Sequence, residues 1–257
     1  MNPNCLRAVQ FSMNARIVSL LAFSLIMGLT LADEASSYQP KTGEALAKRV
    51  REAMPPSDIE GRAILRTRER SGDWTEYDLR MSTRLVAIDR WRVNYVAKSR
   101  EGEERVLVIE HGRDRLPRYE RRQGKSEQNV LSRGDAASTK GYAGSEFSPL
   151  DLGLDFLHWP KQELVNHRIT MRRSRPCFVI ESSDPDYHGA PYTRVLSWID
   201  REHLVIMRSE AYDISGKLLK TFEPDDVTKV NGEWRVKTVE IRNRSTKRKS
   251  ELEFLYD

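Results

Sequence analysis

Histidines are the residues of this chain best suited to acid–base catalysis or to binding a transition metal, because imidazole changes charge near neutral pH and is a common metal ligand. Five occur, at positions His111, His158, His167, His188 and His203. None has a neighbour at metal-ligand spacing such as H-E-x-x-H, and the sequence shows no nucleophile elbow, phosphate-binding glycine loop or cysteine pair for zinc. Asp184, Asp186 and His188 cluster between prolines and a glycine, which is typical of a hydrogen-bonded loop. We therefore expect no catalytic residue, no metal and no cofactor.

A strongly apolar segment is the second feature with chemical consequences. Ser148 is a suitable helix cap, Pro149 suits the first helical position and Asp151 suits the first turn. The segment ends at Pro160 and is apolar over nearly the whole helical circumference, at Leu150, Leu152, Leu154, Phe156, Leu157 and Trp159. The sequence predicts a helix over 149–159 that is either buried on most sides or covers another apolar surface.

The N-terminus has the order of a secretory signal peptide. Arg7 and Arg16 precede an apolar run over 17–31, and Thr30-Leu31-Ala32 places small residues at the two positions that signal peptidase reads. The run of 15 residues is short for a membrane span, although a single anchoring helix is the alternative. We expect cleavage after Ala32 and export to the periplasm.

Charge and cysteine content restrict the partners. Without the signal peptide the chain keeps 41 of its 43 basic residues and all 38 acidic ones, a surplus of +3. Nucleic-acid binding would need a clustered basic stripe. The nearest candidate is Lys247-Arg248-Lys249, flanked by Arg242 and Arg244, which is typical of a solvated hairpin turn. Cys177 remains without a second cysteine, so no intramolecular disulfide can form, and its apolar neighbours indicate a buried thiol.

Residues 33–41 are predicted to be a flexible leader, and residues 42–257 a single domain, because undivided all-β proteins often have this size. A helix over 42–54 is indicated by the cap Thr42 and by the prolines that follow it. Its apolar stripe consists of Ala45, Leu46, Val50, Ala53 and Met54.

From Gly61 onward the apolar period changes to two, as in strands with one buried and one solvated face. The alternating apolar residues are Tyr77, Leu79 and Met81 in one run and Trp91, Val93 and Tyr95 in the next. Residues 106–109 are continuously apolar, which is consistent with burial on both faces. Turn signals at 71–73, 88–89 and 100–103 separate these runs, so we expect hairpins in an antiparallel sheet.

Residues 121–146 are polar and rich in Gly and Ser, and we expect a long loop there. Strands are predicted near 169–173, 177–182, 192–200, 204–212, 218–223, 227–230, 234–241 and 251–256. Asn231-Gly232 is the strongest hairpin signal in the chain.

Several stretches of this second half resemble the outer-membrane lipoprotein-sorting family, the LolA-like proteins. Gly144-Ser145-Glu146-Phe147-Ser148 is similar to that family's glycine-serine-aspartate-phenylalanine-serine at the start of a helix. Residues 177–181 stand where the family has its central strand, 192–200 resemble its tyrosine to tryptophan-isoleucine-aspartate strand, and 211–220 resemble its next hairpin. The resemblance covers 42–257, and its specific motifs lie between 144 and 220. These are packing and turn motifs, so they indicate fold more than activity.

The resemblance implies a mainly β protein of the α+β class, an incomplete antiparallel β-barrel or strongly curved sheet with helices covering its concave face. Members carry the acyl chains of lipoproteins or related lipids, and relatives regulate envelope stress. The arginine that closes the lid in well-studied carriers has no recognisable local motif here, so no such residue is assigned.

We therefore hypothesise a periplasmic lipid carrier or lipoprotein-sorting chaperone that binds acyl chains in an apolar cavity under a helical lid. Each buried methylene contributes about 0.8 kcal/mol, so a chain of ~14 carbons supplies roughly 10 kcal/mol before entropic costs. The expected lid and lining residues are Phe147, Leu150, Leu154, Phe156, Leu157 and Trp159, with Trp91, Tyr95 and Trp198 from strands. The expected partners are lipoprotein acyl chains or another lipid and an inner-membrane transporter, and not nucleic acid. The alternative is a non-lipid envelope sensor or a scaffold partner of an inner-membrane exporter, in which these side chains only fill the core.

Overall fold

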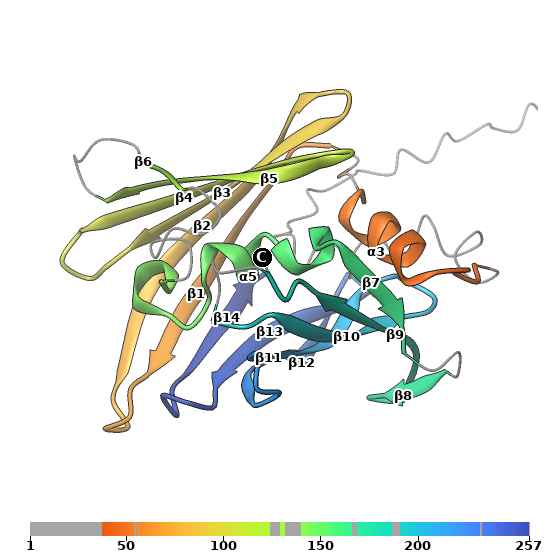
Figure 1. Cartoon of the computed structure of the whole chain (residues 1–257). Helices are drawn as coiled ribbons and strands as arrows, with labels where there is room; N and C mark the ends of the chain where they lie inside the picture. Colours follow the sequence, from red (N-terminus) through yellow and green to blue (C-terminus); the bar gives the residue numbers. More distant parts are fainter. Residues whose placement is uncertain are drawn as a thin grey trace, which may run out of the picture.

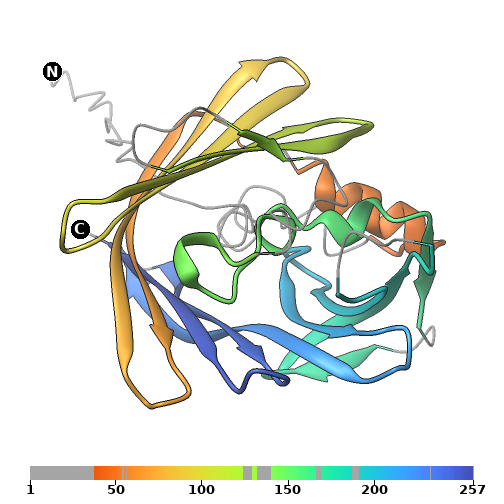
Figure 2. The same ribbon diagram turned by 60° about the vertical axis from the view of Figure 1, so that its left-hand side comes forward.

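One large antiparallel sheet dominates the computed structural model, which describes residues 38–53, 55, 57–123, 129–131, 140–165, 169–186, 191–231 and 233–256. Among these residues the strand order is β6-β5-β4-β3-β2-β1-β14-β13-β12-β11-β10-β9-β7, with β8 also paired to β9. The sheet curves strongly without closing into a barrel (Figures 1 and 2). The predicted curved, incomplete barrel is therefore confirmed as a curved open sheet.

The strands run through the chain as successive hairpins. The first half contributes β1 (Ile59–Arg68), β2 (Trp74–Ala87), β3 (Arg90–Lys98), β4 (Glu104–Gly112), β5 (Arg115–Gln123) and β6 (Asn129–Leu131). The second half contributes β7 (Lys161–Leu164), β8 (Thr170–Arg172), β9 (Arg175–Ser183), β10 (Arg194–Asp200), β11 (Ile206–Tyr212), β12 (Leu218–Val230), β13 (Glu233–Asn243) and β14 (Lys249–Leu255). β1 pairs with β14, from Arg62 opposite Leu255 to Arg68 opposite Lys249, and this pairing joins the two halves.

This strand order imposes a long connection. β6 and β7 follow each other in the sequence but lie at opposite ends of the strand order. The chain between them must therefore pass from one edge of the sheet to the other. Residues 140–160, which we call the inner segment, are the described part of that connection, and Figure 2 shows them in green within the curve of the strands.

The predicted N-terminal helix is confirmed as α3 (Gly43–Arg51). The Thr42 hydroxyl accepts a hydrogen bond from the Ala45 amide at 3.1 Å, so Thr42 is the cap. Leu46 and Val50 of the predicted stripe are buried, whereas Ala45 is exposed because Gly43 and Ala47 complete the buried face. Met54 lies outside the described residues.

Three sequence predictions are corrected by the sheet. Residues 106–109 are not buried on both faces: Leu107 and Ile109 are buried, while Val106 and Val108 are only half-buried. Residues 121–146 are not one loop, since β5 continues to Gln123 and β6 follows. The two strands expected over 218–230 are one, β12, with irregular pairing to β13 around Pro224 to Val227. The hairpin predicted at Asn231-Gly232 is confirmed by the pairing of Val230 with Glu233.

Most buried apolar side chains belong to one cluster that joins the inward residues of the sheet, α3 and the inner segment. A second, smaller cluster of Cys177, Val179 and Trp198 is separate from it. No helix among the described residues is long and apolar enough to cross a membrane.

Replacing Gly43 with alanine should destabilise the protein, although alanine favours helices by about 1 kcal/mol. A Cβ atom at Gly43 would lie 2.6 Å from the backbone oxygen of Gln162 in β7, and backbone atoms cannot move aside. We expect a loss of roughly 1–3 kcal/mol in the free energy of unfolding, measured by urea titration. Ala45→Ser on the exposed face is the control, and a Gly43→Ala protein as stable as the wild type would contradict this account of the α3–β7 contact.

Candidate ligand-binding site

The inner segment begins as the sequence predicts but does not continue as one helix. It contains η2 (Tyr142–Gly144), α5 (Pro149–Leu152) and η3 (Asp155–His158). The hydroxyl of Ser148 accepts from the Asp151 amide at 3.2 Å, and the Asp151 carboxylate accepts from the Ser148 amide at 2.9 Å, which is a capping box. The predicted helix over 149–159 is therefore confirmed at its start and wrong beyond Leu152.

The helix ends at Gly153, which lies against β5. A Cβ atom at this position would lie 2.4 Å from the hydroxyl of Tyr119 in β5, so only glycine lets the chain approach this strand. Leu154 then adopts a left-handed conformation with φ 52°, and the chain turns into η3. In place of the single helix expected from sequence, residues 149–158 thus form two short turns, α5 and η3.

Eight of the nine predicted lining residues lie together in the main core cluster. Each is at most 6% exposed: Phe147, Leu150, Leu154, Phe156, Leu157 and Trp159 from the inner segment, and Trp91 and Tyr95 from β3. Trp198 does not join them. It packs with Cys177 and Val179, and the guanidinium of Arg172 lies 4.5 Å from its ring centroid. Val195 and Ile199 of the same strand belong to the main cluster, so Trp198 lies on the other face of β10.

A small apolar recess lies beside the inner segment. Its volume is about 30 Å³, about that of one water molecule in the liquid. The apolar lining includes Leu154 and Phe156, and Asp151, Tyr192, Ser209 and Lys220 provide its polar lining. The recess in this conformation is too small for an acyl chain, so the roomy hollow expected from sequence is filled here by the protein's own side chains.

A largely buried ion pair holds the inner segment at this recess. The ammonium of Lys220, in β12, donates to the Asp151 carboxylate at 2.8 Å and to the Glu146 carbonyl oxygen at 3.0 Å. The Tyr192 hydroxyl donates to the second Asp151 oxygen at 2.6 Å. Burial alone would raise the pKa of Asp151, but the charge of Lys220 and the hydrogen bonds from Lys220, Tyr192 and Ser148 outweigh it and lower the pKa. Asp151 is therefore a carboxylate with its full set of partners.

A second set of polar contacts holds the start of the segment. Arg248 pairs with the Glu146 carboxylate at 3.0 Å and donates to the Gly144 carbonyl oxygen at 2.9 Å. Asn243 donates to Glu146 at 2.7 Å, and the Glu146 amide donates to the Ser250 hydroxyl at 2.9 Å. β13, the following turn and β14 thus hold residues 144–146 through side chains.

Tyr142 and Asp155 satisfy buried polar groups at the two ends of the segment. The Tyr142 hydroxyl accepts from the Ala97 amide at 2.9 Å and donates to the Arg105 carbonyl oxygen at 2.6 Å. Burial raises the pKa of Tyr142 far above its ordinary value. The Asp155 carboxylate accepts from the Trp159 indole at 3.2 Å. Arg51 of α3 donates to the Leu157 carbonyl oxygen at 2.9 Å, which ties the segment to the helix.

Sequence reasoning did not identify Lys220, Glu146, Arg248 or Tyr142 as site residues. A signal existed for Lys220, because strand alternation places it on the same face as Phe222, and a lysine on an apolar face needs a buried partner. From the sequence, Arg248 is predicted only to be part of a basic hairpin turn. Nothing in the local pattern distinguishes it from its neighbours.

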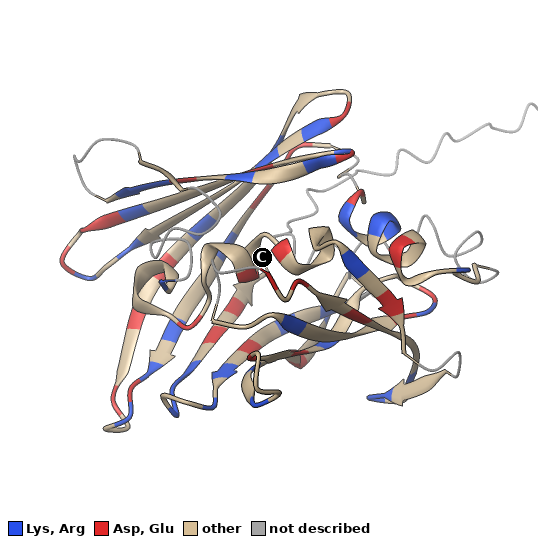
Figure 3. Ribbon diagram, viewed as in Figure 1, with Lys and Arg blue, Asp and Glu red and all other residues tan. Residues whose placement is uncertain are grey.

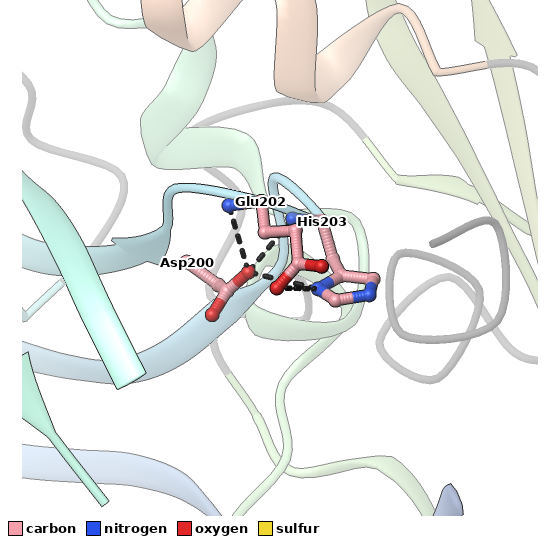
Figure 4. A group of neighbouring side chains, drawn as sticks. All are labelled: Asp200, Glu202 and His203. Carbon is pink, nitrogen blue, oxygen red and sulfur yellow. Dashed lines mark hydrogen bonds and ion pairs between the residues drawn. The ribbon is translucent and has the colours of Figure 1, made fainter. Parts of the chain in front are cut away.

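Asp200, Glu202 and His203 form a compact group at the end of β10, with candidate ligand atoms within 4.8 Å of one another (Figure 4). Arg175 donates to Asp200 at 2.7 Å and to Glu202 at 2.9 Å, so a guanidinium already supplies the positive charge. Burial would raise the pKa of Asp200, but the hydrogen bonds from His203 and Arg175 lower it. The Asp200 carboxylate also accepts from the His203 amide, so this group stabilises a turn and we assign it no metal.

The other chemical candidates from the sequence have ordinary environments. Cys177 is buried, and burial raises the pKa of its thiol to about 12, which disfavours a reactive thiolate. His111 is buried against Trp91, with ring centroids 5.4 Å apart. Asp184 directly follows β9, and its amide donates to the Thr193 carbonyl oxygen. His167 and His188 lie outside the described residues.

Comparisons with known proteins support the resemblance seen in the sequence at the level of fold. The chain is similar to a DUF1329 family protein from Desulfovibrio piger, with a TM-score of 0.67 and 15% identity over 83% of this chain and 90% of that one. It is similar to a putative outer membrane lipoprotein-sorting protein domain from Vibrio parahaemolyticus, with a TM-score of 0.63 and 17% identity over 88% and 92% of the two chains.

A LolA superfamily protein from Nitrosomonas europaea is similar with a TM-score of 0.58 and 16% identity, over 84% of this chain and 93% of that one. A family model described as "-like: Uncharacterized protein" matches residues 130–256. No curated protein matches the chain. The predicted resemblance to the LolA-like proteins is thus confirmed, and at these identities it establishes the fold.

Removing Lys220 should be far more damaging than removing both charges of the pair. Lys220→Ala leaves the Asp151 carboxylate buried without a cation, and we expect a loss of about 3–5 kcal/mol in the free energy of unfolding at pH 7. Lys220→Met combined with Asp151→Asn keeps the helix cap and should recover most of the loss. Urea titrations measure both, with Lys229→Met on an exposed site as the control. Equal stability of Lys220→Ala and the double variant would refute the role of the pair.

His111 should make the protein less stable in acid. Burial, with a smaller contribution from His158, lowers its pKa from 6.5 to about 3. Between these values the unfolded chain binds a proton that the native protein excludes. The contribution of His111 to the free energy of unfolding is therefore complete above pH 6.5 and decreases as the pH falls. The slope is about 1.4 kcal/mol per pH unit. His111→Phe keeps an aromatic ring against Trp91 and should remove this slope in urea titrations from pH 7 to pH 4. A stability difference independent of pH would contradict the assignment.

Proposed function

We propose that this chain is a carrier of acyl chains in the bacterial periplasm, of the lipoprotein-sorting kind, with the inner segment as a displaceable cover. The observation that carries the proposal is the inner segment itself. Its apolar side chains fill a curved sheet, while its backbone is bent and held largely by polar side chains of other elements. The similarity in fold to an outer membrane lipoprotein-sorting domain supports the same function.

The segment and an acyl chain would compete for one apolar surface. Leu154 and Phe156 already line the recess, so a lipid chain would enter there and displace them. A chain of ~14 carbons offers roughly 10 kcal/mol of burial before entropic costs. Breaking a buried ion pair such as Lys220–Asp151 costs less, about 3–5 kcal/mol. Such a site needs no catalytic group.

The route to the periplasm is part of the proposal. A signal peptide ending at Ala32 would deliver the chain to a compartment where lipids cross between two membranes in water. Lipoprotein acyl chains or another lipid are the proposed cargo, and an inner-membrane transporter is the proposed donor. The signal residues lie outside the described residues.

Acyl-chain binding can be tested with a fluorescent fatty acid and by mass spectrometry of lipid that co-purifies with the protein. We expect saturable uptake, reduced at least tenfold in Leu154→Glu, because a carboxylate in the recess repels an apolar chain. Ala211→Leu fills the same recess without adding charge and should also reduce uptake. Ile88→Glu is the matched control, since Ile88 is 90% exposed and does not line the recess.

Circular dichroism would confirm that each variant is folded. A wild-type protein that carries no lipid and takes up no fatty acid would overturn the carrier proposal. It would favour the sensor or scaffold function instead.

A further inference from the structure

A strongly basic groove lies at one end of the sheet and shares no lining residue with the recess. It is formed by the turn between β1 and β2 and the turn between β13 and β14, which the pairing of Arg68 with Lys249 sets side by side. Seven of its eleven lining residues are Lys or Arg and one, Glu69, is acidic; its volume is about 560 Å³. We call it the turn groove. Figure 3 shows Lys and Arg at these turns, at the lower left of the view.

Three of the seven cations have partners within the protein. Arg242 and Lys249 both pair with Glu240, and Arg248 pairs with Glu69 and Glu146. The other four, Arg68, Arg70, Arg244 and Lys247, are exposed and have no carboxylate partner among the described residues. Elsewhere on the sheet arginines commonly face carboxylates across strands, as in Arg208–Glu223. The turn groove therefore concentrates positive charge that the fold does not compensate.

The turn itself does not require a lysine. Lys247 has φ 59°, in the left-handed region that glycine and asparagine adopt most readily. A β-carbon at this position destabilises the turn, so the charge of Lys247 is the better explanation for a lysine there. Converging guanidinium and ammonium groups are the donors that bind phosphate, through charge-assisted hydrogen bonds.

Exposed apolar side chains flank the turn groove. Trp74 pairs with Arg68 at the start of β2, is 43% exposed and lies 5.3 Å from the ammonium of Lys249. Ile214, 75% exposed, lies in the turn between β11 and β12. That turn adjoins the basic one, since the Arg244 amide donates to the Leu219 carbonyl oxygen at 2.7 Å. Tryptophan and aliphatic side chains next to basic ones are typical of proteins that lie on a membrane surface.

We propose that the turn groove binds the phosphate groups of anionic phospholipids, so that this end of the sheet docks on a membrane surface. The cations meet the headgroups, and Trp74 and Ile214 enter the interface between headgroups and acyl chains. A soluble phosphate compound would use the cations but would leave these two apolar side chains in water. The apolar neighbours are therefore the reason to assign the lipid surface.

Flotation with vesicles tests the docking surface on the full chain. We expect binding to vesicles of phosphatidylglycerol and phosphatidylcholine, weakened by salt, and no binding to phosphatidylcholine alone. Arg70→Glu, Arg244→Glu and Lys247→Glu together should weaken binding about 100-fold or more. The control combines Arg118→Glu, Arg122→Glu and Lys229→Glu, which are also exposed and change the net charge equally. It should keep most of the binding.

Two outcomes would overturn the proposal. Equal losses in the two triple variants would show general attraction by net charge. Binding of inorganic phosphate or pyrophosphate at the turn groove without binding to vesicles would assign a soluble ligand instead. If circular dichroism shows the groove triple variant to be unfolded, Arg244→Ala and Arg70→Ala are compared with Arg118→Ala. The two tests can fail separately, because a protein that takes up no fatty acid can still bind these vesicles.

Discussion

The position of β6 and β7 at opposite ends of the strand order is the constraint on which the interior of this protein depends. Consecutive strands at distant edges need a connection across the sheet, and a connection across an apolar concave face must itself be apolar. The inner segment meets this demand with leucines and aromatic residues that are almost fully buried. A buried connection that is not one helix leaves backbone groups without helical partners, and each must find another partner or lose free energy. Lys220, Arg248, Arg51 and Gln162 supply those partners by donating to carbonyl oxygens of the segment.

Two kinds of interaction stabilise the interior: apolar packing and these polar contacts. Apolar packing is non-directional, so another apolar body of similar volume can replace it. Ion pairs and hydrogen bonds are directional, and Asp151 alone serves Ser148, Tyr192 and Lys220. The segment therefore has one well-defined position. A continuous helix would satisfy its interior backbone groups by itself and would need fewer of these side-chain partners.

Sequence alone predicts the parts of this structure that depend on local pattern. The alternation in Trp91, Val93 and Tyr95 and the cap at Ser148 both depend on neighbours within a few residues, and both are confirmed. The need for glycine at position 153 depends on Tyr119 of a distant strand, so no local pattern reveals it. The sequence gives no clear strand signal for β5, because this strand buries only Pro117 and Tyr119 among charged residues. Trp198 is predicted to line the cavity, whereas the alternation of side chains along β10 places it on the other face of the sheet.

Arg248 connects the two ends of this arrangement. Its guanidinium pairs with Glu69 at the edge of the turn groove, at 2.7 Å, and with Glu146 and Gly144 at the start of the inner segment. An anion in the groove would compete with both carboxylates for the same donors, because one guanidinium has a fixed number of N–H groups in a fixed plane. A ligand that weakens the ion pair between Arg248 and Glu146 would destabilise the segment. Because coupling between two sites is reciprocal, the segment in its closed position would lower the affinity for that ligand by the same free energy. The sheet supplies the rigid frame for this coupling, since the pairing of β1 with β14 fixes Glu69 and Arg248 on neighbouring turns.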